Sequence, residues 1–128
     1  MTAREHWKLD PEEHDYSAAA SYLSLLLDEK AVDVLLAELR AASIGHWKAK
    51  DLLRASHLAL LPTDNVHVVS DLKKVKDGAK LSPVLLIRGN MSTSTPLQIV
   101  DGYHRVCASY YIDEDADIPS RMVDAPKA

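Results

Sequence analysis

The sequence has no phenylalanine and only one cysteine among its 128 residues. Without a second cysteine the chain cannot form an internal disulfide. It also has no apolar run that approaches the roughly 20 residues needed to cross a bilayer. We therefore expect neither a disulfide-stapled domain nor a membrane-spanning one, and a reducing cytoplasm is the expected location.

The sequence also lacks an excess of positive charge. Fifteen Lys and Arg residues stand against nineteen Asp and Glu, which gives a net charge of −4. Binding along nucleic acid usually needs a broad basic surface, so this balance argues against DNA or RNA as a partner but allows a small basic site. The six histidines are scattered without the short spacing of zinc ligands, and we expect no metal site built from them.

The length predicts a single domain with one core, and the first 45 residues predict helices. The segment Asp10-Pro11-Glu12-Glu13 is typical of a helix start. Further on, apolar residues recur at the spacing of one helix face, which predicts a helix over about 31–42: Val32, Leu35, Leu36 and Leu39. Such a stripe needs a cover, so these helices should pack on the rest of the chain, on a second copy or on another protein.

The second half of the chain alternates apolar runs with turn residues. Three runs predict strands at Pro83–Arg88, Leu97–Val100 and Ile118–Val123. A helix is predicted from about His104 to Tyr111. The whole pattern predicts an α/β (α+β) fold with a small mixed sheet.

The most informative segment joins the second of these runs to that helix, and it reads Asp101-Gly102-Tyr103-His104-Arg105. Glycine permits a sharp turn and a close approach of backbone to ligand. The free N–H groups and the dipole at a helix start favour anions. Arg105 offers a planar donor fork suited to phosphate, and His104 can donate or carry a proton. The same residues are also typical of a plain strand-to-helix junction.

The ordered set resembles the ParB/sulfiredoxin-like superfamily, whose mark is a strand, a Gly-x-His-Arg turn, a helix and a closing strand with Ile-Pro. Gly102, His104 and Arg105 fill the turn, and Ile118-Pro119 begins the last run. The resemblance covers about residues 46–124 and leaves residues 1–45 as a helical N-terminal extension. It implies a pocket for a phosphate-bearing ligand, which would be ATP or CTP bound together with Mg²⁺.

Further positions follow from the resemblance. It implies that Leu52-Leu53-Arg54 forms a first strand with Arg54 facing the turn. It also implies a helix over about 68–76 that places Lys73, and with it Lys74, near a nucleotide. Tyr103 stands where sulfiredoxins carry their catalytic cysteine, so their reductase reaction is not expected here. Cys107, one helical turn further on, is expected to be a core residue.

The predicted phosphate- or nucleotide-binding residues are therefore Gly102, Tyr103, His104, Arg105, Arg54 and Lys73. Asp101 and His104 are the catalytic candidates, and Asp51 and Asp71 are the other acids expected near the turn. An acid there could serve as a general base, whereas Asp101 could equally cap the turn.

Two functions stay open on this basis. One is an enzyme that transfers or hydrolyses a nucleotide's phosphate. The other is a non-catalytic ligand-sensing or protein-interaction module with a degenerate pocket. Partition proteins of the ParB type add a helix-turn-helix domain, and the four residues after position 124 cannot form one, so sequence-specific DNA binding is not expected.

Overall fold

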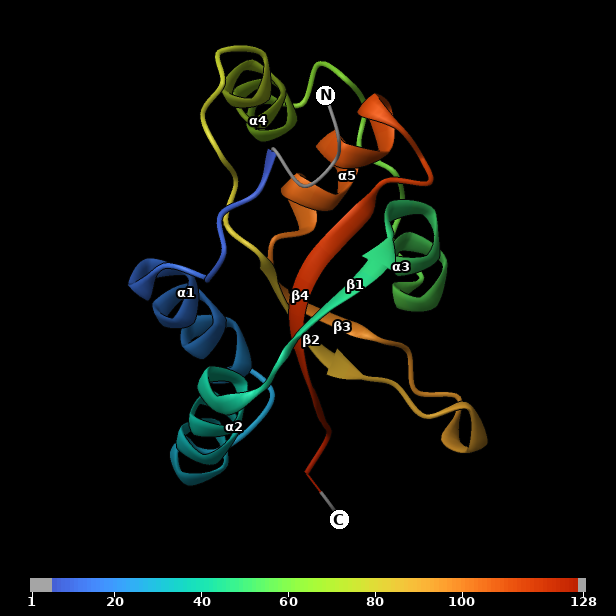
Figure 1. The fold of residues 1–128 in the computed structure, drawn as a ribbon. Coiled ribbons are helices and arrows are strands. Elements are labelled where there is room, and N and C mark those ends of the chain that lie inside the picture. Colours follow the sequence, from blue (N-terminus) through green and yellow to red (C-terminus); the bar gives the residue numbers. More distant parts are fainter. Residues whose placement is uncertain (1–5, 127–128) are drawn as a thin grey trace.

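The computed structural model describes residues 6–126. Residues 1–5 of the predicted extension and residues 127–128 lie outside this range. No described helix is long and apolar enough to cross a membrane. Figure 1 shows the elements in chain order: α1 (Glu13–Leu23), α2 (Glu29–Ala41), β1 (Ile44–Lys48), α3 (Ala49–Ser56), α4 (Val66–Lys76), β2 (Val84–Arg88), a short 3-10 helix η2 (Met91–Thr93), β3 (Gln98–Asp101), α5 (Tyr103–Ile112) and β4 (Asp117–Asp124).

The four strands form one mixed sheet in the order β1-β4-β2-β3. The central pair, β2 and β4, is parallel, while β3 and β1 run antiparallel at the two edges. All three apolar runs that predicted strands lie in this sheet. The predicted α/β class with a small mixed sheet is therefore confirmed.

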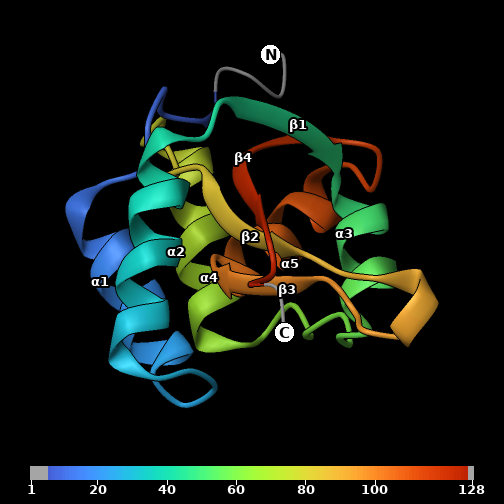
Figure 2. The same cartoon turned by 90° about the horizontal axis from the view of Figure 1, so that it is seen from below.

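Strand β2 explains how the helices are divided between the two faces of the sheet. Its side chains alternate, because successive residues of a strand point to opposite faces. Leu85 and Ile87 pack with the buried residues of α1 and α2. Val84 and Leu86 pack with those of α3, α4 and α5. Figures 1 and 2 show α1 and α2 together on one side of the sheet and α3 on the other.

The predicted N-terminal extension is part of this packing. The stripe residues Val32, Leu35 and Leu39 are buried, and Leu36 packs beside them. Together with the buried face of α1 they cover one face of the sheet. The stripe is therefore covered by the rest of the same chain, which is one of the three partners predicted for it. Residues 6–45 are not a separate appendage.

The first helix begins later than the sequence predicted. Glu12 is its N-cap, and the Glu12 and Asp15 side chains form a reciprocal capping box with the backbone. Asp10 instead accepts from Arg121 Nη2 at 3.0 Å. The proline after Asp10 therefore precedes the helix by two positions.

The strand predicted at Leu52-Leu53-Arg54 is wrong, because these residues lie in helix α3. The buried residues of α3 are Ala49, Leu52, Leu53 and Ser56. Their spacing of three, four and seven residues describes one face of a helix. The edge strand of this region is β1, which ends just before α3 begins.

The helix predicted over about 68–76 is confirmed as α4, although it starts earlier. The Asn65 side chain accepts from the backbone N–H groups of His67 and Val68 and caps the helix start. Val66, Val68 and Val69 therefore lie in the first turn of the helix. Gly78, at φ 81, follows the helix end.

Candidate anion-binding pocket at the start of α5

The predicted turn lies where β3 ends and α5 begins. Gly102 is the N-cap of α5 and adopts φ 108, which side chains disfavour. A Cβ atom at this position would lie 2.8 Å from Val84 Cβ and 3.0 Å from Arg105 Nη2. The glycine is therefore required by its backbone conformation and by the closeness of β2, whether or not a ligand binds.

A pocket of about 290 Å³ opens beside this turn. We call it the turn pocket. It is bounded by the segment before α1, the first turn of α1, one face of α4, the residues just before β2, and the start of α5. Its lining residues are Lys8, Glu12, His14, Asp15, His67, Ser70, Asp71, Lys74, Lys80, Leu81, Ser82, Asp101, Gly102, His104 and Arg105.

The segment before α1 forms one wall because it is tied to the residues before β2. The N–H of Lys8 donates to the carbonyl oxygen of Leu81 at 2.8 Å, and the N–H of Leu81 donates to that of His6 at 2.8 Å. Trp7, between His6 and Lys8, is buried in the core that α3, α4 and α5 form with the sheet. These contacts bring Lys8 and Lys80 to the same rim.

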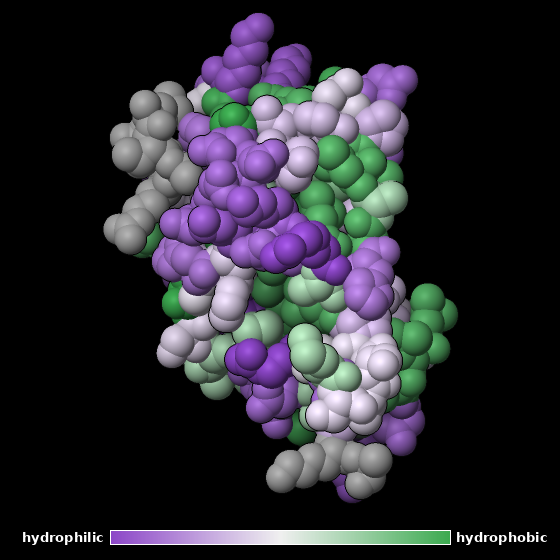
Figure 3. Space-filling view, turned by 90° about the vertical axis from the view of Figure 1, so that its right-hand side faces the viewer, coloured by the Kyte–Doolittle hydropathy of each residue, from purple (hydrophilic) through white to green (hydrophobic). Residues whose placement is uncertain are grey.

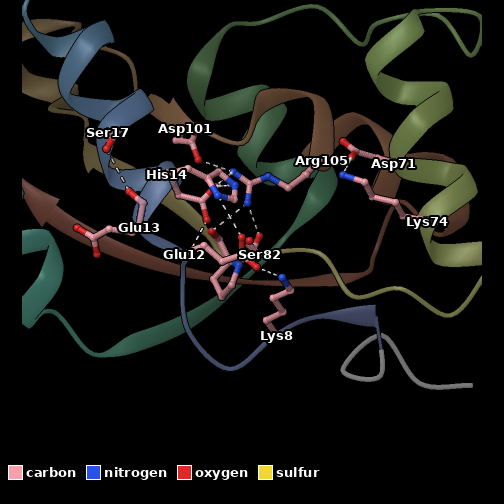
Figure 4. A network of polar contacts seen from close by, with 12 residues as sticks. Lys8, Glu12, Glu13, His14, Ser17, Asp71, Lys74, Ser82, Asp101 and Arg105 are labelled. Atoms are coloured by element: carbon pink, nitrogen blue, oxygen red, sulfur yellow. Dashed lines mark hydrogen bonds and ion pairs between the residues drawn. The ribbon is translucent and has the colours of Figure 1, made fainter.

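Arg105 points from α5 into the space between β3 and the residues before β2 (Figure 4). Its Nη1 donates to the carbonyl oxygen of Ser82 at 2.6 Å, and its Nη2 lies 2.5 Å from Asp101 Oδ2. A second carboxylate is also close, because Asp15 Oδ1 lies 3.5 Å from the same Nη2. The guanidinium predicted to grip a ligand is thus already held by the protein, and only 12% of its side chain is exposed.

The two carboxylates beside Arg105 come from elements far apart in the sequence. Asp101 ends β3, while Asp15 is a buried residue of the first turn of α1. Burial raises the pKa of Asp101 to about 6, the neighbouring Asp15 adds to the rise, and Arg105 opposes it. Asp101 therefore holds a proton more readily than a surface carboxylate would.

The α4 side of the turn pocket carries a second group of titratable residues. The rings of His67 and His104 lie with their centroids 4.5 Å apart. Burial lowers the pKa of His104, and His67 lowers it further. Burial raises the pKa of Asp71, whose Oδ1 lies 3.9 Å from Lys74 Nζ. Shifted proton affinities around one cavity are typical of functional sites.

The structure brings together some of the predicted residues. Asp101, Gly102, His104 and Arg105 all line the turn pocket, and so does Asp71. Tyr103 does not, because its hydroxyl donates to the carbonyl oxygen of Ala59 in the loop before α4. The tyrosine thus anchors that loop instead of facing a ligand.

Two predicted cations are placed elsewhere. Arg54 lies on the exposed face of α3 with 82% of its side chain accessible, and it pairs with Asp51 of the same helix at 3.0 Å. The prediction that it faces the turn is wrong, because it assumed a strand where the chain forms a helix. Lys73 does not line the turn pocket either, whereas its neighbour Lys74 does. Successive residues of a helix point about 100° apart, which separates the two lysines.

Sequence reasoning missed the contribution of the N-terminal segment. Lys8, Glu12, His14 and Asp15 all line the turn pocket. Their local pattern predicts a helix start, and acids are common there for reasons of capping alone. Nothing in that pattern says which other element the acids will meet.

A second and larger hollow lies on another side of the molecule, between α3, β1 and the loop from β2 to β3. It measures about 620 Å³ and is largely apolar, with Trp47, Leu52, Leu86, Leu97 and Met122 among its lining residues. Figure 3 views the molecule from the side of α3 and shows hydrophobic surface between more hydrophilic segments. None of the predicted binding residues lines it.

Among residues 6–126, no group of three or more His, Cys, Asp or Glu side chains is placed to hold a metal ion. No protein-family model, no curated protein and no solved structure matches this chain. Its function must therefore be inferred from the turn pocket itself.

Proposed function

We propose that the protein binds a phosphate-bearing small molecule in the turn pocket, with a phosphate group against the first turn of α5. The observation that carries this proposal is the position of the pocket, which borders Gly102 and His104 at the N-terminus of a ten-residue helix. The first N–H groups of a helix have no helical acceptor, and the helix dipole adds positive potential there. Both favour an oxyanion at this place.

Cations for such a ligand are available even though Arg105 is engaged. Lys8, Lys74 and Lys80 stand on the rim of the pocket with exposed side chains. Lys8 pairs with Glu12, and Lys74 lies at the long distance of 3.9 Å from Asp71. The Lys8–Glu12 pair is solvent-exposed and contributes only about 0–1 kcal/mol. The Lys74 ammonium is exposed and lies beyond hydrogen-bond distance of the buried Asp71 carboxylate. The lysines can therefore turn to a bound phosphate at little cost.

A nucleotide is the ligand we favour. The pocket, at about 290 Å³, lies at the small end of the roughly 300–1,000 Å³ range of small-molecule sites. It has room for phosphate groups and leaves the rest of a nucleotide near the rim. The resemblance of residues 46–124 to ParB/sulfiredoxin-like domains supports ATP or CTP, with Mg²⁺ brought in on the phosphates.

Phosphoryl transfer or hydrolysis forms the catalytic part of this proposal. Catalysis of this kind depends mostly on positioning and charge neutralisation. His104 is the better candidate for a proton acceptor, because its lowered pKa keeps the ring neutral near pH 7. Asp101 is engaged by Arg105 at 2.5 Å, so its role is to hold that arginine. A cytoplasmic location stays a prediction.

Calorimetric titration with ATP and CTP, with and without Mg²⁺, tests the proposal. Lys74→Ala should weaken binding about 10- to 100-fold if its ammonium contacts phosphate, since a hydrogen bond to a charged group contributes roughly 1.5–3 kcal/mol. Lys73→Ala is the matched control, because it removes the same charge from the adjacent position outside the pocket. No binding heat and no thermal shift for the folded protein at millimolar ligand would refute the proposal.

The alternative of a non-catalytic ligand sensor is favoured by one observation. Arg105 contacts the carbonyl oxygens of Ser82 and Pro83 and the carboxylates of Asp101 and Asp15, which leaves little of its donor fork for a substrate. Turnover assays under the same conditions separate the two functions. Binding without release of phosphate or diphosphate would identify the sensor.

A further inference from the structure

The contact between Asp15 and Arg105 joins the first turn of α1 to the turn that begins α5. It is the looser of the two carboxylate contacts of Arg105, at 3.5 Å against 2.5 Å for Asp101. Good charge-assisted N–H···O bonds measure about 2.7–2.9 Å. Breaking the contact with Asp15 should therefore cost less free energy than breaking the contact with Asp101.

Charge balance favours that exchange when an anion arrives. Asp15 and Asp101 already share the Arg105 guanidinium inside the protein. A phosphate bound beside them would place a third anionic group around one buried cation. Like charges at this separation repel strongly where water is scarce. Exchange of Asp15 for the ligand avoids this crowding, because one anion then replaces another.

We propose that the first turn of α1 is an autoinhibitory latch, in which the Asp15 carboxylate occupies an anion position at Arg105 and a phosphate-bearing ligand binds by displacing it. This inference rests on the proposed function of the turn pocket and describes how that site is regulated.

The structure limits the movement to the first turn of α1. Tyr16, Ala19 and Leu23 hold the remainder of α1 against β2 and β3, where they are buried among aliphatic side chains. The Asp15 side chain is buried too, but polar contacts hold it instead of apolar packing: its Oδ2 accepts from the N–H of Glu12 at 2.8 Å, and its carboxylate contacts Arg105 and Asp101. Opening the latch therefore breaks the capping box and leaves the core intact.

Several other charged groups around the latch already have partners. Glu12 pairs with Lys8 from the segment before the helix, and Asp71 lies near Lys74 on α4. His14 Nε2 lies 3.5 Å from Asp15 Oδ1 on the exposed side. A displaced Asp15 would thus move toward His14 and water, while the lysines become available to the ligand.

The test compares Asp15→Asn with wild type by calorimetric titration of inorganic phosphate and of ATP. The substitution removes the competing charge, and its amide oxygen can still accept from the N–H of Glu12. If the latch exists, binding should tighten about tenfold, within the usual range of coupling between sites. Glu13→Gln is the matched control, since it removes an acid from the same turn that pairs with Arg40 outside the turn pocket. It should leave affinity unchanged.

Hydrogen exchange of the wild-type protein provides a readout that needs no variant. Ligand should accelerate exchange of the amides at positions 15–18 while the second half of α1 stays protected. If Asp15→Asn binds as wild type does, or these amides stay equally protected when ligand is bound, the latch is refuted and the proposed function stands. If neither protein binds phosphate or ATP, the proposed function fails, and the latch fails with it.

Discussion

Arg105 and Arg54 were both predicted to face the same turn, and the structure gives them opposite environments. Arg105 is nearly buried and meets the carboxylates of Asp15 and Asp101 together with two backbone carbonyl oxygens. Arg54 is 82% exposed and has a carboxylate three residues earlier on its own helix. The residue type is the same, but we expect the two side chains to contribute very differently to the stability of the fold.

The two arginines differ in which partner groups would lose their contacts if the guanidinium were removed. Around Arg105, two acids and two carbonyl groups depend on its charge and donors in a place with little water. Around Arg54, water can replace every contact. A buried charge is strongly coupled to its partners, while an exposed ion pair contributes little. Four substitutions test this contrast, from the largest expected effect to the smallest.

Arg105→Ala should cause the largest loss of stability, about 3–5 kcal/mol, because it orphans buried carboxylates. Urea unfolding at pH 7 measures it. Arg105→Lys should recover part of the loss, since an ammonium restores the charge but not the planar fork. A loss below about 1 kcal/mol would show that the Arg105 cluster is solvated and that the contrast with Arg54 is illusory.

Gly102→Ala should come next, at about 2–3 kcal/mol, because it disturbs the turn that positions Arg105. The new Cβ would clash with Val84, and the alanine would have to adopt φ 108. The substitution therefore combines overpacking with left-handed backbone strain. Gly78→Ala is the control, since that glycine has φ 81 with nothing within 4 Å of a Cβ. It should show only the strain, near 1 kcal/mol. If both variants lost the same free energy of unfolding in urea, the Val84 side chain would have moved aside to make room for the new Cβ.

Asp101→Asn should change how stability depends on pH. In the wild type the pKa of Asp101 is raised from 3.8 to about 6 in the folded state. Between these values the folded protein binds more protons than the unfolded chain, so this group's contribution to stability falls as pH rises from 4 to 6, by at most about 1.4 kcal/mol per pH unit. The variant lacks this contribution.

Urea unfolding at several pH values between 4 and 7 isolates that contribution. The free energy of unfolding of Asp101→Asn, minus that of the wild type, should increase with pH across this window. His104 acts in the opposite sense in both proteins, because its pKa is lowered, and it largely cancels in the difference. Parallel pH curves would show that Asp101 is as easily ionised as a surface acid.

The sequence predicted three of the four strands and the α5 turn, because their signals are local, but it did not predict β1. Strands β2, β3 and β4 contain the apolar runs, and Asp-Gly before a helix-like segment predicts the turn directly. The region of α3 was predicted wrongly for a local reason too. Three residues, Leu52-Leu53-Arg54, are too few to separate strand from helix. The wider spacing of Ala49, Leu52, Leu53 and Ser56 carries the helical signal.

The composition of the turn pocket was less predictable. The choice of Lys74 over Lys73 depends on the rotation of α4 about its axis, which follows from the burial of Val68 in the core. The contact of Asp15 with Arg105 depends on how α1 lies across the sheet, and that follows from packing of Tyr16, Ala19 and Leu23. Such long-range placement comes from the whole core and leaves no mark on the nearby sequence.

Arg54→Ala should have the smallest effect, within about 0.5 kcal/mol in urea unfolding. Its ion pair with Asp51 spans one turn of an exposed helix face, and pairs of this kind contribute about 0.3–0.5 kcal/mol. ATP affinity should not change either, because Arg54 lies outside the turn pocket. A tenfold weaker binding of ATP by a normally stable Arg54→Ala would reverse this conclusion. It would mean that Arg54 reaches the ligand, as the resemblance to ParB/sulfiredoxin-like domains implied, and that α3 moves toward the turn when the site is filled.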